Sequence, residues 1–304
     1  MPYRESRDFG TNPESRDVTE GLKSLLAEIA LSVNIDAFEK YRIRNLLDPD
    51  CKVSVPGFAD PEKGIYDPEI IAESDAEVKA REREFSRATV PAVQEHYAET
   101  HGAHTEEEII NVWKANKSKE KNGQMEMAVT ALLHKVLGKR YLVVRTADYD
   151  DYVGGVDNII VDKETGVVIC GFDDVHEGGD GERTQTKQEK VRRIAKKGGA
   201  KLRFGLEFEN GSLHRAALEN LPVFYLGLSS DELIELTRSM SYSLSEKPTE
   251  KEIQIFSRLL ESVRAQLADL KGQEVPFAVR RNLQRFEESL PVIRKTGVRS
   301  ARAA

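Results

Sequence analysis

The first 120 residues combine amphipathic helical sequence with one proline-containing loop. In the stretch DVTEGLKSLLAEIALSV, apolar side chains recur on one predicted helix face: Leu22, Leu25, Leu26, Ile29 and Leu31. The segment 46–69 holds four prolines, which predicts a loop, and the sequence over 73–120 predicts further helices. Residues 1–120 are therefore predicted to form a helical N-terminal region.

A different pattern begins at residue 121. The stretch NGQMEMAVTALLHKVLG predicts an apolar helix that ends at Gly138. Short β-type runs follow at 141–146, 157–161, 167–175, 201–208 and 222–228. A basic helix, TQTKQEKVRRIAKKGG, lies between the third run and the fourth. The order of helix, three strands, helix and one or two strands predicts an α/β (α+β) core over residues 121–230.

Helical sequence returns over residues 231–304 and ends in a basic tail. Within it, apolar residues recur at spacings of three and four: Ile253, Phe256, Leu260, Val263, Leu267 and Leu270. The repeat is shorter than the three to four heptads typical of a coiled coil, so packing within the chain is favoured. A homodimer through residues 253–270 is the alternative.

The segment GGVDNIIVDKETGVVICGFDDVHEGG places acids at the ends of two predicted strands. The DKETG sequence between the apolar runs indicates a hairpin turn. Depending on the register of the hairpin, either Asp173, or Asp174 with His176, shares a sheet face with Asp157. Two carboxylates from different strands converge in either register.

Converging carboxylates repel each other unless a positive charge neutralises them. Mg²⁺, like the similar ion Mn²⁺, is a hard cation that prefers oxygen ligands, and it keeps waters in its remaining positions. A bound cation lowers the pKa of such a water and offsets the charge that builds up on a phosphodiester. The pattern therefore predicts a metal-dependent site that hydrolyses phosphate esters.

The order of elements, taken with these acids, resembles the PD-(D/E)XK nuclease superfamily and its restriction-endonuclease-like core, with helical N- and C-terminal extensions here. The resemblance covers residues 121–230. The family's acid at the start of the second strand matches Asp157 in GGVD, and its acid on the third strand matches Asp173 or Asp174 in FDDVH. A glutamate that family members often add from the first helix matches Glu126 in QMEMAV. The resemblance implies a nuclease whose Mg²⁺ or Mn²⁺ is held by Asp157 and by Asp173 or Asp174, with Glu126 as an assisting ligand.

The sequence departs from the family at the motif lysine, which in that family orients or activates the attacking water. His176 stands where the lysine would follow Asp174. A lysine from the following helix, Lys187 or Lys190, is one substitute. His176 itself is another, because the ordinary histidine pKa suits a base near neutral pH. Catalytic roles are therefore expected for Asp157, Asp174, His176, Lys187 and Lys190.

Between residues 183 and 203, nine basic side chains stand against one acid, although the whole chain is acidic. Such a local excess predicts a groove that attracts a phosphate backbone, with DNA favoured over RNA. The predicted nucleic-acid contacts are Arg183, Lys187, Lys190, Arg192, Arg193, Lys196, Lys197 and Lys201. The alternative is a solvated basic face that balances the acidic N-terminal region.

Composition narrows the function classes. The 304 residues carry a net charge of −7, and they include no run apolar enough for a membrane span and no apolar leader, so a cytoplasmic location is expected. The motifs GxSxG, GxxxxGK[ST] and GxGxxG are absent, which disfavours common hydrolases, NTPases and dinucleotide enzymes. The leading hypothesis is a metal-dependent nuclease. The alternative is a non-catalytic module that binds nucleic acid or protein, on the same fold or an unrelated α+β fold.

Overall fold

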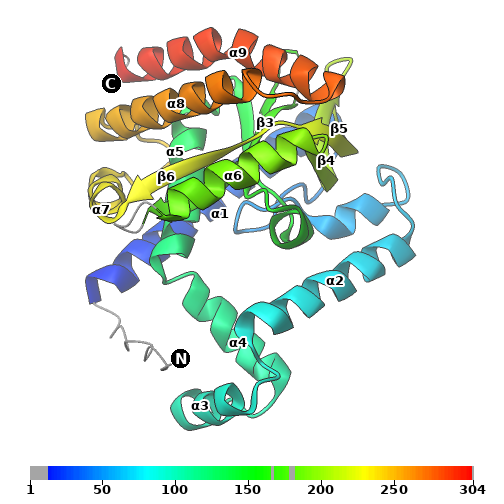
Figure 1. Cartoon of the computed structure of the whole chain (residues 1–304), viewed down its shortest axis with the longest axis vertical. Coiled ribbons are helices and arrows are strands. Elements are labelled where there is room, and N and C mark those ends of the chain that lie inside the picture. The colour runs from blue at the N-terminus through cyan, green and yellow to red at the C-terminus, as the bar shows by residue number, and fades with distance from the viewer. Residues whose placement is uncertain (1–12, 166–167, 178–181, 303–304) are drawn as a thin grey trace.

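The computed structural model describes residues 13–165, 168–177 and 182–302 (Figure 1). Its centre is a four-stranded sheet in the order β1-β2-β3-β6, which confirms the mixed α/β class. The strands are β1 (Tyr141–Arg145), β2 (Asn158–Asp162), β3 (Val168–Glu177) and β6 (Val223–Ser229). The first three pair antiparallel, whereas β6 runs parallel to β3.

Helices cover both faces of this sheet. Helix α5 (Lys121–Leu137) is buried along most of its length and ends before Gly138, as its apolar pattern predicts. Asn158 is opposite Phe172, and Phe172 is opposite Phe224, so these side chains share one face. That face packs against α5, α8 (Glu250–Lys271) and α9 (Phe277–Arg302), while α6 (Glu182–Lys196) covers the other. Asp174 and Asp173, as neighbours in β3, therefore point to opposite faces.

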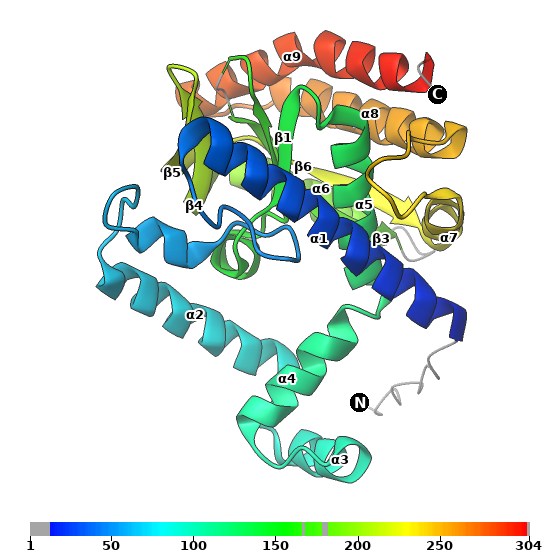
Figure 2. The ribbon, with the colours of Figure 1, turned by 180° about the vertical axis from the view of Figure 1, so that it is seen from behind.

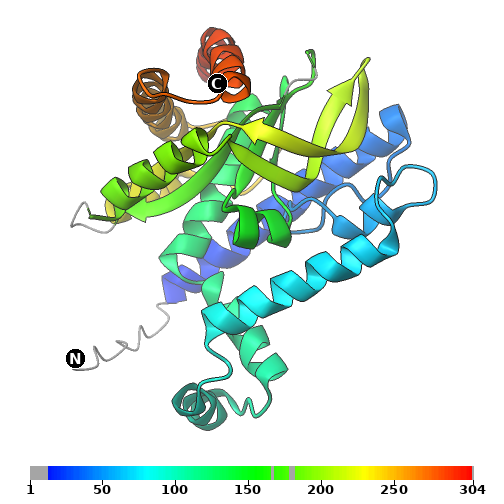
Figure 3. The same ribbon diagram turned by 45° about the vertical axis from the view of Figure 1, so that its right-hand side comes forward.

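A hairpin is inserted between α6 and β6. It consists of β4 (Ala200–Glu209) and β5 (Ser212–Leu221), which form a separate two-stranded sheet, yellow-green in Figure 3. Asn210 and Gly211 both adopt the positive φ that a tight hairpin turn requires. Strand β5 was not predicted, because SLHRAALENL is poor in the β-branched and aromatic residues that mark strands.

The first N-terminal helix packs against α5, and the helices that follow it extend away from the sheet (Figures 1 and 2). The N-terminal elements are α1 (Pro13–Tyr41), the short turn η1 (Val55–Ala59), α2 (Pro68–Ser86), α3 (Pro91–His101) and α4 (Glu106–Lys117). Helix α1 packs on α5 through Leu22, Leu25, Leu26 and Ile29. Leu31 was predicted on the same face but is 61% exposed. It is only two residues from Ile29, and residues two apart point to different sides of a helix.

The C-terminal region is helical, with α7 (Ser230–Ser239) preceding α8 and α9. The seam of α8 packs within the chain: Phe256, Val263, Leu267 and Leu270 are buried, and Ile253 and Leu260 lie at the margin of the core. Helices α8 and α9 lie side by side across the top of the molecule in Figures 1 and 2. Nowhere in the described ranges is a helix long and apolar enough to cross a bilayer.

Candidate functional site

Asp157 lies immediately before β2, and backbone hydrogen bonds to both neighbouring segments fix its position. Its amide donates to the carbonyl of Phe172 at 2.7 Å, and its carbonyl accepts from the amide of Thr146 at 2.9 Å. The chain reaches it through Gly155, whose positive φ disfavours any other residue and whose missing side chain leaves room for Lys190 Nζ. Gly155 therefore lets the chain turn into β2 and place Asp157 at the junction of β1, β2 and β3.

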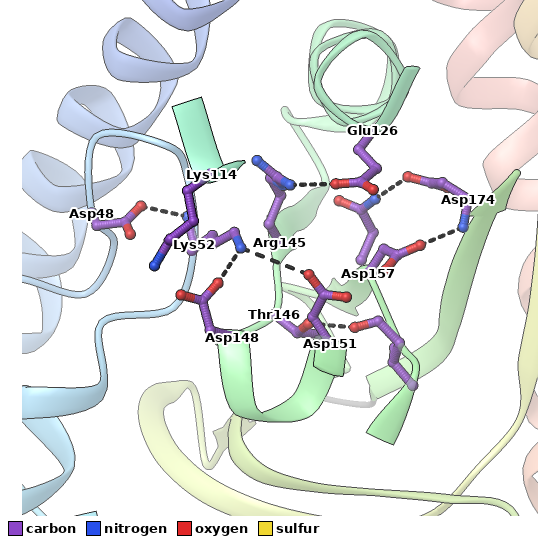
Figure 4. A network of polar contacts seen from close by, with 12 residues as sticks. Asp48, Lys52, Lys114, Glu126, Arg145, Thr146, Asp148, Asp151, Asp157 and Asp174 are labelled. Carbon is purple, nitrogen blue, oxygen red and sulfur yellow. Dashed lines mark hydrogen bonds and ion pairs between the residues drawn. The ribbon is translucent and has the colours of Figure 1, made fainter. Parts of the chain in front are cut away.

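Asp174 meets Asp157 from β3 (Figure 4). The amide of Asp174 donates to Asp157 Oδ2 at 2.6 Å, and Asn158 Nδ2 donates to Asp174 Oδ2 at 2.7 Å. The Asn158 amide is itself fixed, because its Oδ1 accepts from Thr130 Oγ1 of α5 at 2.7 Å. These hydrogen bonds orient the Asp174 carboxylate and tie the Asp174 backbone to Asp157, while the Asp173 side chain points to the opposite face of β3.

The second oxygen of Asp174, Oδ1, is buried and has no hydrogen-bond partner among the described residues. A carboxylate has about four lone-pair sites, and burying one oxygen without a donor carries a desolvation cost of roughly 1–3 kcal/mol or more for a charged group. A cation or a hydrogen-bond donor beside Asp174 Oδ1 would remove this cost, and the described residues supply neither.

The pKa values of the Asp157 and Asp174 carboxyls are shifted in the same direction, upward. Burial raises the pKa of Asp157 well above its ordinary value, and the charges of Asp151, Glu126, Asp174 and Asp173 raise it further. Burial, followed by Glu126 and Asp173, also raises the pKa of Asp174 well above its ordinary value. Arg145 and Lys187 act on Asp174 in the opposite direction, but the net direction is upward. The site carries more negative charge than its own side chains neutralise.

Glu126, predicted as a third acid, does face the pair from α5. Its Oε2 is 2.8 Å from Nη2 of the buried Arg145, which ends β1. Arg145 thus holds Glu126 at the edge of the acid pair and supplies one positive charge. Its Nε has no hydrogen-bond partner within the described part of the chain.

Asp173 occupies the opposite face of β3. Lys187 Nζ lies 2.5 Å from its Oδ1, and Lys190 Nζ lies 2.6 Å from its Oδ2. Both lysines come from α6, so the helix after β3 does direct two ammonium groups back to the acid-bearing strand. The Asp173 carboxylate is fully occupied by these two cations.

Besides Arg145, Asn158 and Thr130, a group of charged residues beside the pair was not found from the sequence: Lys52, Asp148 and Asp151. Lys52 is brought in by segment 51–53, which pairs with the outer edge of β1. Its Nζ forms ion pairs with Asp148 and, at 3.7 Å, with Asp151 (Figure 4). The acids DYDD between two predicted strands were an available signal for Asp148 and Asp151. No local pattern marks Lys52, because its place depends on a contact across nearly 100 residues.

The predicted nucleic-acid contacts fall into three groups. Lys187, Lys190, Arg192 and Lys201 form ion pairs, the last two with Asp269 and Glu219. Arg193, Lys196 and Lys197 are exposed, and none has an ion-pair partner among the described residues. The side chains of Arg183 and His176 lie outside the part of the chain whose side chains are described; the backbone of His176 pairs with Leu228.

The site can be compared with what a divalent cation requires. Among the described residues, no three His, Cys, Asp or Glu side chains converge to hold one ion. Mg²⁺, however, is usually bound through one or two carboxylates, with waters and substrate phosphates as the other ligands. Asp157 and Asp174 fit that arrangement, because Asp174 Oδ1 is a buried acceptor without a donor and both carboxyls have raised pKa values. Glu126 and Asp173 are each already bound to cationic side chains.

No protein-family model, curated protein or solved structure matches this chain.

Proposed function

We propose that this protein is a divalent-cation-dependent nuclease whose active site is the Asp157–Asp174 pair. The observation that carries the proposal is the buried, unpartnered Oδ1 of Asp174 beside a second carboxylate with a raised pKa. Such a pair is stable in its ionised form only when a cation is bound. Mg²⁺ or Mn²⁺, with water and phosphate oxygens completing its ligands, satisfies this need.

The arrangement of elements supports the same proposal. A helix, an antiparallel meander of three strands, a second helix and a strand parallel to the third form the core, with acids where two strands meet. This is the order of the restriction-endonuclease-like fold that the sequence resembles. The β4–β5 hairpin is an insertion into that order.

The side chains of this chain have distinct roles under the proposal. Asp157 and Asp174 hold the cation, and Asn158 and Thr130 keep the Asp174 carboxylate in place. When bound, the cation supplies an activated water and stabilises the charge that develops on the phosphodiester. Arg145 binds Glu126 and offsets part of the negative charge that this carboxylate adds at the site.

Lys187 and Lys190 are the candidates for the role of the missing motif lysine. Both ammonium groups contact Asp173 at the strand that bears Asp174, and the charge of Lys187 lowers the pKa of Asp174. Both lysines bind Asp173 on the opposite face of β3, so the role requires one ammonium group to turn from Asp173 towards the attacking water or a phosphate oxygen when substrate binds. His176 remains the alternative for this role.

The test is a cleavage assay on labelled single-stranded DNA, duplex DNA and RNA with Mg²⁺, Mn²⁺ or EDTA. We expect cleavage only with a divalent cation, and a loss of about 100-fold or more in Asp157→Asn and Asp174→Asn. Asp269→Asn is the matched control, since among the described residues this partly exposed carboxylate forms an ion pair with Arg192 alone. Undiminished cleavage in both site variants would contradict the assignment.

The alternative function, a non-catalytic module that binds nucleic acid or protein, predicts a different result. Calorimetric titration with Mn²⁺ separates the two hypotheses without relying on turnover. Binding by the wild type that is lost in Asp157→Asn supports the cation site. Equal heats for the two proteins, together with an absence of cleavage, favour the non-catalytic module.

A further inference from the structure

Three aromatic side chains from separate segments gather beside the acid pair. Phe85 lies at the end of α2, Trp113 lies in α4, and Tyr152 lies in the single π-helical turn Asp150–Gly154. The rings of Phe85 and Trp113 are 6.4 Å apart, and those of Phe85 and Tyr152 are 5.7 Å apart and nearly perpendicular. Phe85 is 47% exposed, while the other two are half-buried. The cluster thus presents an aromatic ring to solvent on a fixed aromatic base.

Lysines surround this cluster. Lys117 Nζ lies 5.0 Å from the centre of the Tyr152 ring and 6.0 Å from that of Trp113. Lys52 Nζ lies 5.8 Å from the centre of the Tyr152 ring. Across the described ranges, Lys117 has no carboxylate within ion-pair distance, so its charge is available to a ligand.

The cluster is continuous with the acid pair. Tyr152 directly follows Asp151, and Asp151 is 3.7 Å from Lys52 Nζ and close enough to raise the pKa of Asp157. Figure 4 shows Lys52 with Asp148 and Asp151, and the acid pair beyond Arg145. Aromatic surface, lysines and acids therefore follow one another across a single region.

We propose that Phe85, Trp113 and Tyr152 form a stacking platform for an unpaired base, and that Lys117 binds the adjoining phosphate backbone. Single-strand binding sites combine aromatic rings with positive charge in this way, because every base has a face that can stack. A duplex keeps its bases paired and stacked internally, so the platform selects single-stranded or frayed nucleic acid. This inference rests on the proposed function and names the substrate class of the same site.

The chain offers a direct probe, because Trp113 is its only tryptophan. Titration of the full chain with an eight-nucleotide oligothymidylate in EDTA is expected to quench the Trp113 fluorescence. A duplex of the same length is expected to quench it at least about tenfold less effectively. EDTA removes any contribution from cation binding and from cleavage. A matching oligouridylate shows whether the platform distinguishes RNA from DNA.

Phe85→Ala is expected to raise the Kd for the oligothymidylate by about tenfold or more, measured by anisotropy of a labelled strand. Phe85→Leu keeps an apolar side chain and is expected to weaken binding comparably, because stacking requires the ring. Phe277→Ala is the matched control, since this phenylalanine is 79% exposed at the distant start of α9. Circular dichroism establishes that the variants are folded.

Unchanged Kd values in both Phe85 variants, or equal binding of single strand and duplex, would overturn the platform. Its failure is separable from failure of the nuclease proposal. Asp157→Asn is expected to lose cleavage yet keep the Trp113 quenching. Cleavage that persists in Asp157→Asn contradicts the acid pair and leaves the stacking measurement unaffected.

Discussion

Asn158 donates its side-chain amide to Oδ2 of Asp174 at 2.7 Å, while Oδ1 of the same carboxylate is buried without a partner. One oxygen is held in place and the other is left open. A purely structural carboxylate in a buried position would have both oxygens satisfied. Oδ2 of Asp174 therefore positions the carboxylate, and Oδ1 is free to bind a ligand.

Removing a charge from the acid pair is expected to stabilise the cation-free protein. A carboxyl whose folded pKa is raised favours the protonated form, so it contributes stability at low pH that is lost as pH rises above its ordinary value of 3.8. Near neutral pH, Asp157→Asn should melt at a higher temperature than the wild type in EDTA, by about 2 °C or more.

Adding Mn²⁺ should reverse that order, because it binds only the folded wild type. At a cation concentration 100 times its Kd, the expected stabilisation is about 2.7 kcal/mol. Scanning calorimetry with and without Mn²⁺ measures both effects. Asp269→Asn serves as the control and should follow the wild type in both buffers. An Asp157→Asn protein that is stabilised equally by Mn²⁺ would exclude Asp157 as a ligand.

Lys187→Met and Lys190→Met distinguish a catalytic from a structural role for the lysines of α6. We expect at least one variant to lower the cleavage rate by about 100-fold, with the Kd for Mn²⁺ little changed, because the cation ligands remain. Lys247→Met is the control, because this lysine is exposed between α7 and α8 and is not one of the predicted nucleic-acid contacts. If neither lysine affects cleavage while His176→Gln does, His176 has the role instead.

His134 should make the protein sensitive to acid. Burial and the charge of Lys163 lower the pKa of His134 from 6.5 to about 4. Its neutral form is favoured in the folded state, so this stability is complete above pH 6.5 and is lost as pH falls towards 4. The total loss is roughly 3 kcal/mol.

Urea unfolding of the wild type and of His134→Gln at several pH values between 7 and 4 measures this contribution. The variant should show a flatter decline in the free energy of unfolding over that range. His214→Gln replaces an exposed histidine and should leave the wild-type slope intact. Parallel slopes for the wild type and His134→Gln would contradict the prediction.

A buried ion pair joins α5 to α8. Lys135 Nζ lies 2.8 Å from Glu252 Oε1, and the two side chains are 1% and 0% exposed. Lys135→Met alone leaves a buried, uncompensated carboxylate and should lower the free energy of unfolding by about 3–5 kcal/mol. The double variant with Glu252→Gln should recover most of that loss, as a double-mutant cycle by urea unfolding will measure. An exposed pair, Lys271 with Glu287, supplies the control and should contribute under about 1 kcal/mol.

The spacing of apolar residues predicted those helices and strands that depend only on residues near one another in the sequence. The helix over 121–137 and the strands of the β1–β3 meander follow from apolar spacing within a few residues. The choice between Asp173 and Asp174 could not be made in this way. The hairpin contains an irregularity between Ile160 and Val161 that shifts the pairing by one residue, and turn composition gives no sign of it.

The missed residues have a common origin. Lys52 and Arg145 meet because a loop pairs with the edge of β1, and Asn158 acquires its role through Thr130 on another element. These are contacts between distant segments, and each involves a residue type that is common at surfaces. The acids were recognisable because they coincide with the predicted order of strands and with a glutamate on the preceding helix. Their cationic and amide partners were not.

The insertion that separates β3 from β6 also affects how the protein is made. Asp157 and Asp174 leave the ribosome well before β6 (Val223–Ser229), which completes the sheet beside β3. Until that strand arrives, β3 has an open edge and its acids remain hydrated, so their mutual repulsion is weak. We therefore expect the charged centre to become buried late, when the C-terminal third of the chain is synthesised and packs over the sheet.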